Sequence, residues 1–231
     1  MIALSRTLGP LGSRPVPENV LLMDSADVGF MRRCFDLARA AVERDELPFG
    51  SVVARGAEEI SAEANGVRAS ADVTRHAEVC AIVAAQRHFG RPSLEGCTLY
   101  TNVEPCAFCS YAIRESRIAR VVFALSSPVM GGTSRWDVLQ DRGLAGAMPE
   151  VFAPAPEVVA GFLADEADAV LRETAPLMWA ATRARGLFVC EDAGRLSRPS
   201  AQAEGALGAL KARAMDLLRR RFFDRFSRGT A

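Results

Sequence analysis

Two short motifs in the middle of the chain constrain its fold and chemistry more than any other feature. The first is His-Ala-Glu at residues 76–78, and the second is Pro-Cys-Ala-Phe-Cys at residues 105–109. One imidazole and two thiolates make three zinc ligands, and a catalytic zinc keeps three protein ligands while its fourth position stays open for water. We therefore expect the fold to bring His76, Cys106 and Cys109 together around Zn2+.

The spacing within each motif suggests how its side chains are used. Glu78 lies two residues after His76, so on a helix its side chain points away from the direction of the imidazole. It is therefore better placed to move protons near the metal than to bind it. Cys106 and Cys109 are three residues apart, which places both thiolates on one helical turn, and Pro105 suits the first turn of a helix. If both motifs begin helices, the positive ends of two helix dipoles favour the thiolate form at the metal.

The order His-x-Glu followed by Pro-Cys-x-x-Cys is the signature of zinc-dependent nucleobase deaminases. The chain resembles the cytidine deaminase superfamily, and within it the branch of guanine deaminases and tRNA adenosine deaminases. The resemblance covers roughly residues 24–172 and implies an α/β, three-layer α-β-α fold with a five-stranded mixed sheet. It also implies hydrolysis by a water whose pKa zinc lowers to about 7. Glu78 would carry the water proton to the base and to the departing ammonia.

Three other interpretations of the motifs are weaker. A structural zinc site usually has a fourth protein ligand, and the only other histidine, His88, is twelve residues along the same expected helix from His76. A thioredoxin-like redox pair would leave His76 and Glu78 without a role. A zinc-stabilised binding module that has kept the fold without its chemistry would bind zinc and release no ammonia.

The resemblance extends to several residues outside the metal motifs. Asn65 matches an asparagine that binds the base or sugar in these deaminases, although an Asn-Gly turn also explains it. Phe49 could stack on a base or pack in the core. Trp136 follows a Gly-Gly loop and could close over a substrate or simply pack against the protein. Glu104, directly before Pro105, is interpreted as a supporting carboxylate and not as a catalytic one.

The substrate is not settled by these residues. A free nucleobase or nucleoside, with a guanine-like purine favoured, suits the Pro-Phe-Gly at residues 48–50 and the balance of 28 basic against 28 acidic residues, which gives no global attraction to nucleic acid. The alternative is conversion of adenosine to inosine in tRNA. The Arg-Ile-Ala-Arg-Val-Val segment at residues 117–122 resembles the tRNA adenosine deaminases that catalyse this reaction. Arg75 leaves this choice open, because only a few tRNA-type relatives carry arginine there.

Location and assembly follow from composition and from the resemblance. The six cysteines are scattered among apolar residues, which suits reduced thiols in a cytoplasm better than a disulfide framework. The sequence has neither an apolar run near 18 residues nor a signal-like start. We expect a cytoplasmic enzyme without membrane contact, and the resemblance implies a homodimer or higher homo-oligomer.

We expect the chain to divide into an irregular arm at residues 1–20, a deaminase domain at 21–190, and a linker with a basic amphipathic helix at 191–231. Strands alternating with helices in the second half of the sheet favour parallel pairing there. Periodicity predicts helices over residues 24–44, 76–89, 105–116, 156–172, 176–185 and 201–227. It predicts strands over residues 51–54, 59–64, 97–102, 119–124 and 150–152.

Overall fold

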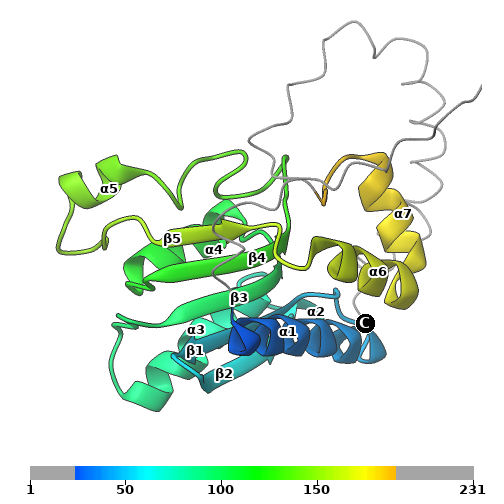
Figure 1. The fold of residues 1–231 in the computed structure, drawn as a ribbon, viewed down its shortest axis with the longest axis horizontal. Helices are drawn as coiled ribbons and strands as arrows, with labels where there is room; N and C mark the ends of the chain where they lie inside the picture. Colours follow the sequence, from blue (N-terminus) through cyan, green and yellow to red (C-terminus); the bar gives the residue numbers. More distant parts are fainter. Residues whose placement is uncertain (1–23, 191–231) are drawn as a thin grey trace, which may run out of the picture.

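A five-stranded sheet is the centre of the computed structural model, which describes residues 24–190 (Figure 1). Its strand order is β2-β1-β3-β4-β5. Strand β1 runs antiparallel to both β2 and β3, whereas β3, β4 and β5 are parallel, which confirms the mixed sheet and its late parallel pairing. The strands are β1 (Gly50–Arg55), β2 (Glu58–Ala64), β3 (Thr98–Val103), β4 (Arg120–Leu125) and β5 (Glu157–Ala160).

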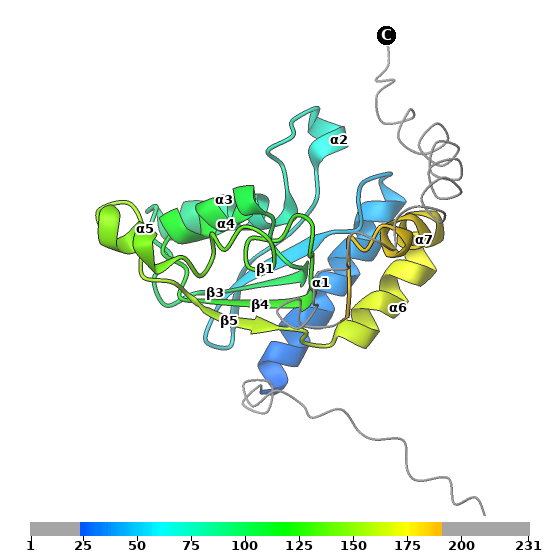
Figure 2. The ribbon, with the colours of Figure 1, turned by 90° about the horizontal axis from the view of Figure 1, so that it is seen from above.

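Helices cover both faces of the sheet, so the predicted three-layer architecture is confirmed (Figure 2). One face is covered by α1 (Ser25–Glu43), α6 (Ala164–Thr174) and α7 (Pro176–Ala184). The other face carries α3 (Ala77–Phe89) and α4 (Ala107–Glu115). Two short helices, α2 (Val67–Ser70) and α5 (Arg142–Ala147), lie in connections. The periodicity did not predict them, because elements this short show no helical repeat.

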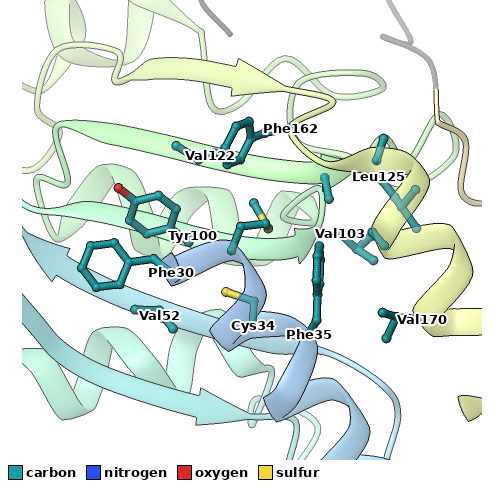
Figure 3. Close-up of a cluster of buried hydrophobic side chains, with 14 of the residues drawn as sticks. Phe30, Cys34, Phe35, Val52, Tyr100, Val103, Val122, Leu125, Phe162 and Val170 are labelled. Carbon is teal, nitrogen blue, oxygen red and sulfur yellow. The ribbon is translucent and has the colours of Figure 1, made fainter. Parts of the chain in front are cut away.

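The core under α1 is built from side chains on alternate strand positions (Figure 3). Phe30, Cys34 and Phe35 of α1 pack over Val52 of β1 and Val122 of β4. Because successive side chains of a strand point to opposite faces, the residues next to them pack beneath α3 and α4. That second cluster includes Val53, Leu99, Val121 and Phe123. The apolar runs of the central strands therefore follow from helices on both faces.

The expected fifth strand at residues 150–152 and the expected start of the next helix at residue 156 are wrong. Strand β5 is Glu157–Ala160, paired with β4, and α6 begins only at Ala164. Gly161 and Leu163 adopt positive φ angles of 76° and 56°, which separate strand from helix. The apolar residues of the strand and of the helix happened to fall at helical spacing, so periodicity joined two elements into one.

The expected arm at residues 1–20, the linker after residue 190 and the helix at residues 201–227 lie outside the described residues. Within residues 24–190, no helix combines the length and apolar character needed to cross a membrane.

Arg114 in α4 is almost completely buried, at 1% exposure, and ties the following connection to the domain. Its guanidinium donates to the backbone carbonyls of Val138, Asp141 and Ala153 at 2.9, 2.7 and 3.0 Å. The residues between these carbonyls include α5, so a single side chain holds both ends of a connection that has little apolar contact of its own. No sequence pattern pointed to this role.

Replacing Arg114 by Met should destabilise the domain by at least about 3 kcal/mol, because three buried or partly buried carbonyls would lose a charged donor. Urea unfolding measures the change. Arg117→Met is the matched control, since Arg117 donates to the carbonyls of Pro149 and Glu150 at exposed positions, and it should cost less than about 1 kcal/mol. Equal losses in the two variants would contradict the role given to Arg114.

Candidate metal centre and active site

The donor atoms of His76, Cys106 and Cys109 lie together, as the sequence predicts. His76 Nδ1 is 3.3 Å from Cys109 Sγ and 3.6 Å from Cys106 Sγ, and the two sulfurs are 3.6 Å apart. Two sulfurs bound tetrahedrally to zinc at about 2.3 Å would be separated by about 3.8 Å. The three side chains therefore fit a zinc ion, and in residues 24–190 no further His, Cys, Asp or Glu joins this group.

Two helix starts produce this convergence. His76 is the N-cap of α3 and Cys106 is the N-cap of α4, both with extended backbone and with no capping hydrogen bond from the side chain. Their side chains are therefore left to face the metal position, at the positive ends of two helices. Pro105 lies one residue before the N-cap and not inside the first turn, because α4 begins at Ala107.

The parallel strands explain where the site lies. Cys106 follows the carboxyl end of β3, and the loop at residues 126–136 follows the carboxyl end of the neighbouring strand β4. In open α/β sheets ligands bind beyond these ends, near the point where the direction of strand connection changes. The metal position and this loop are thus brought to one edge of the sheet.

The thiols and the imidazole influence one another strongly. Hydrogen bonding with Cys109, and then with His76, lowers the pKa of the Cys106 thiol to about 4. The same contact with Cys106, together with burial, raises the pKa of Cys109 well above its usual value. The hydrogen bond with Cys106 also raises the pKa of His76. One thiolate is therefore stabilised by the surrounding groups alone, as a zinc ligand requires.

Glu78 occupies the first turn of α3 and is only 8% exposed. Burial, followed by the nearby Cys106 thiolate, raises the pKa of its carboxyl group to about 7. It does not belong to the group of three converging donors, but it forms a side-chain hydrogen bond with Cys109, which places it directly beside the ligand set. A carboxyl group placed this way is suited to accept and return a proton near the metal.

Asn65 lies beside the segment that leads into His76. It follows β2, is only 3% exposed, and its backbone N–H donates to the carbonyl of Phe49 at 3.0 Å. The next residue, Gly66, donates to the carbonyl of Arg75 at 3.0 Å. The side-chain amide of Asn65 donates to Glu46 at 2.9 Å, so Asn65 is held by tertiary contacts and is more than a turn residue.

Phe49 packs against the core on the α1 face, and its ring meets Phe188 edge-on at a centroid distance of 6.0 Å. The Pro-Phe-Gly motif has a packing reason as well, because a Cβ at Gly50 would overlap the backbone carbonyl of Cys34 in α1. Asn102 holds the same turn by accepting from the Gly50 N–H at 3.0 Å and donating to Pro48 O at 2.9 Å. A stacking role for Phe49 stays a prediction.

Glu104 organises the loop after β4. Its carboxylate accepts from the backbone N–H groups of Ser127, Thr133 and Ser134 at 2.6, 3.0 and 2.7 Å, and from the Ser134 hydroxyl at 2.5 Å. A Cβ at Gly131 would overlap this carboxylate, so a glycine is needed there. Glu104 is therefore a supporting carboxylate, as expected from its place before Pro105.

Trp136 stands at the exposed end of the same loop. Its side chain is 56% exposed, and the guanidinium of Arg135 lies 4.8 Å from the ring centroid. Its backbone N–H donates to Gly131, which itself forms a β-bridge with Cys106. The indole is therefore not part of the core, and its contact with substrate stays a prediction. His88 is also exposed, with its ring against Phe89.

Known proteins are similar to this chain in sequence. Residues 24–125 match the model of the cytidine and deoxycytidylate deaminase zinc-binding region. A tRNA-specific adenosine deaminase from Aquifex aeolicus is 38% identical over 116 residues, which cover 50% of this chain and 77% of that protein. A tRNA(Ile)-lysidine synthase from Deinococcus deserti is 35% identical over 154 residues, which cover 66% of this chain but only 27% of that much longer protein.

Solved structures agree with these matches. A tRNA:A34 deaminase that carries out A-to-I editing at the wobble position superposes with a TM-score of 0.55 at 32% identity, covering 62% of this chain and 99% of that one. A guanine deaminase from Nitrosomonas europaea shares the fold at 23% identity, with a TM-score of 0.52 and coverage of 73% and 98%. The chain belongs to the cytidine and deoxycytidylate deaminase family, whose zinc-binding region it carries, and it is a hydrolase that acts on a C–N bond.

Proposed function

We propose that His76, Cys106 and Cys109 hold the zinc ion and that Glu78 moves the protons of a hydrolytic deamination. The bound ion would supply a Lewis acid that acidifies water at neutral pH. Glu78, buried in the first turn of α3, takes up the proton that this water loses. It delivers this proton to a ring nitrogen, then takes up the second proton of the attacking oxygen and passes it to the departing amine, so that water and the amino base yield a keto base and ammonia.

The proposed substrate is adenosine in tRNA, converted to inosine with release of ammonia. The observation that carries this choice is the 38% identity to a tRNA-specific adenosine deaminase across 77% of that protein. The sequence favoured a guanine-like purine instead, but Pro-Phe-Gly, one of the features on which that preference rested, has a packing role in the fold. The likeness to the guanine deaminase, at 23% identity, supports only the shared fold.

The rim of the site is compatible with a polymeric substrate. Trp136 and Arg135 form an exposed aromatic and cationic pair on the loop beside Cys106, and Arg75, directly before His76, is exposed as well. Exposed aromatic rings can stack on unpaired bases, and arginines contact phosphates. Such groups suit an anticodon loop better than a small base enclosed on all sides.

The test is a deamination screen with the purified zinc-loaded protein. The substrates are a tRNA anticodon stem-loop with adenosine at the wobble position, the same RNA with guanosine there, and free guanine, adenine, cytosine and adenosine. We expect inosine from the adenosine RNA, detected by mass spectrometry, with affinity that falls as salt rises. Faster turnover of free guanine would establish the small-purine function instead. Bound zinc with no turnover at all would leave a non-catalytic binding module.

Self-association and a cytoplasmic location stay predictions. The exposed side chains of Phe108 and Tyr111 on α4, with Val129 and Met130 on the loop after β4, are compatible with contact to a second copy of the chain.

A further inference from the structure

We infer that Glu46 is a positioning residue that fixes the orientation of the Asn65 amide and so determines which groups Asn65 offers to the base, an inference that rests on the proposed deaminase function. Glu46 lies between α1 and β1, outside both zinc motifs. Nothing in its own surroundings in the sequence marks it as functional, and its role emerges only from the tertiary contacts of its carboxylate.

The contacts leave one orientation for the amide. Glu46 is 6% exposed, and its Oε2 accepts a hydrogen bond from Asn65 Nδ2 at 2.9 Å. Both oxygens of the Glu46 side chain act as acceptors, one for Asn65 Nδ2 and the other for the Ala69 N–H, so the amide oxygen of Asn65 cannot take the place of its nitrogen opposite Glu46. Asn65 Oδ1 and the second N–H of Nδ2 therefore keep fixed positions.

The carboxylate itself is held in place from several directions. Its Oε1 accepts from the backbone N–H of Ala69 at 2.7 Å, within α2. The backbone N–H of Glu46 donates to the carbonyl of Ala41 at 2.9 Å. The neighbouring Asp45 forms an ion pair with Arg68 of α2 at 2.7 Å and also accepts from it through its backbone carbonyl. Contacts with the end of α1 and with α2 thus fix the position of the Glu46 carboxylate that faces Asn65.

The pair of Glu46 and Asn65 is connected to the active site through backbone hydrogen bonds. Asn65 and Gly66 are hydrogen bonded to the segments at Phe49 and Arg75, and Arg75 directly precedes the zinc ligand His76. An amide fixed at this position presents one acceptor and one donor in a defined order. A flipped amide would exchange the donor and the acceptor, so that its donor would face a donor of the same base and its acceptor would face an acceptor. Glu46 therefore acts on recognition of the base through Asn65.

A double-mutant cycle separates this role from simple stabilisation. Glu46→Gln keeps the shape of the side chain but can present an amide NH2 to Asn65, which removes the preference for one orientation. We expect KM to rise about tenfold with kcat and zinc content little changed. Asn65→Ala should raise KM as well, and adding Glu46→Gln to it should have no further effect. Glu43→Gln, an exposed glutamate three residues away, is the matched control and should leave KM unchanged.

A second readout does not depend on turnover. In 15N spectra, the Asn65 side-chain amide is identified by its loss in Asn65→Ala, and it should exchange with solvent more slowly in the wild type than in Glu46→Gln. If the wild type deaminates nothing in the screen, the proposed function fails, and this measurement still decides whether Glu46 fixes the amide. Glu46→Asp, whose carboxylate is too short to reach Asn65 unchanged, replaces Glu46→Gln if that variant does not fold. An equal KM penalty for Glu46→Gln with and without Asn65, or unchanged amide exchange, would overturn the inference.

Discussion

Replacing Glu78 by Gln should lower the deamination rate by about 100- to 10,000-fold, the usual contribution of a general acid–base group. The amide of glutamine keeps the size of the side chain but can neither take up nor return a proton. Because Glu78 is outside the group of three converging donors, the variant should keep its zinc and its fold. Single-turnover rates on the substrate found in the screen, together with elemental analysis, measure both properties.

The matched control is Glu115→Gln, which makes the same change at an exposed position at the end of α4. It should retain the wild-type rate. If Glu78→Gln stays within tenfold of the wild type, the proton transfer assigned to Glu78 does not occur. If instead it loses zinc, Glu78 is part of the metal site and its separation from the ligands is wrong.

Replacing Cys106 by Ala should remove most of the bound zinc and with it all measurable activity. Two protein ligands would remain, one fewer than a catalytic zinc keeps, and the lost thiol is the one whose pKa the surroundings lower to about 4. A metal that binds the folded state stabilises it by mass action, so the increase in melting temperature on adding zinc should also disappear. Elemental analysis and thermal unfolding with and without zinc measure these effects.

Cys190→Ala is the control, because Cys190 is a half-buried thiol outside the group of three donors. It should keep one zinc per chain and the zinc-dependent increase in melting temperature. Wild-type zinc content in Cys106→Ala would contradict the ligand assignment, whatever the activity of that variant.

The sequence predicted what depends on short-range patterns. His76, Cys106 and Cys109 occur in local motifs with fixed spacing, and the helices that carry them have clear starts and apolar repeats. The strands β1, β3 and β4 are likewise visible as largely apolar segments between turns, whereas β2 is more polar and is marked by the turn that joins it to β1. Strand β5 was misplaced because its few residues form a strand only by pairing with β4, and no local sequence pattern predicts that pairing.

The supporting residues of the site were harder to find for the same reason. Glu46 meets Asn65 across 19 positions of sequence, and Arg114 meets the carbonyl of Ala153 across 39. A glutamate near a helix end or an arginine on a helix normally lies in solvent, so neither residue stands out in the sequence. Only the fold shows that these two polar side chains are buried and bonded.

The position of the zinc donors along the chain has a consequence for biosynthesis. His76, Cys106 and Cys109 all precede β4, whereas β5, α6 and α7 come from residues 157–184. A ribosome that adds roughly 5–20 residues per second therefore exposes the complete donor set several seconds before the last layer of the α1-face core. Metal capture by the nascent chain would first order the starts of α3 and α4, which carry the donors. Strand β5 and helices α6 and α7 would then be added to a domain that already holds its ion.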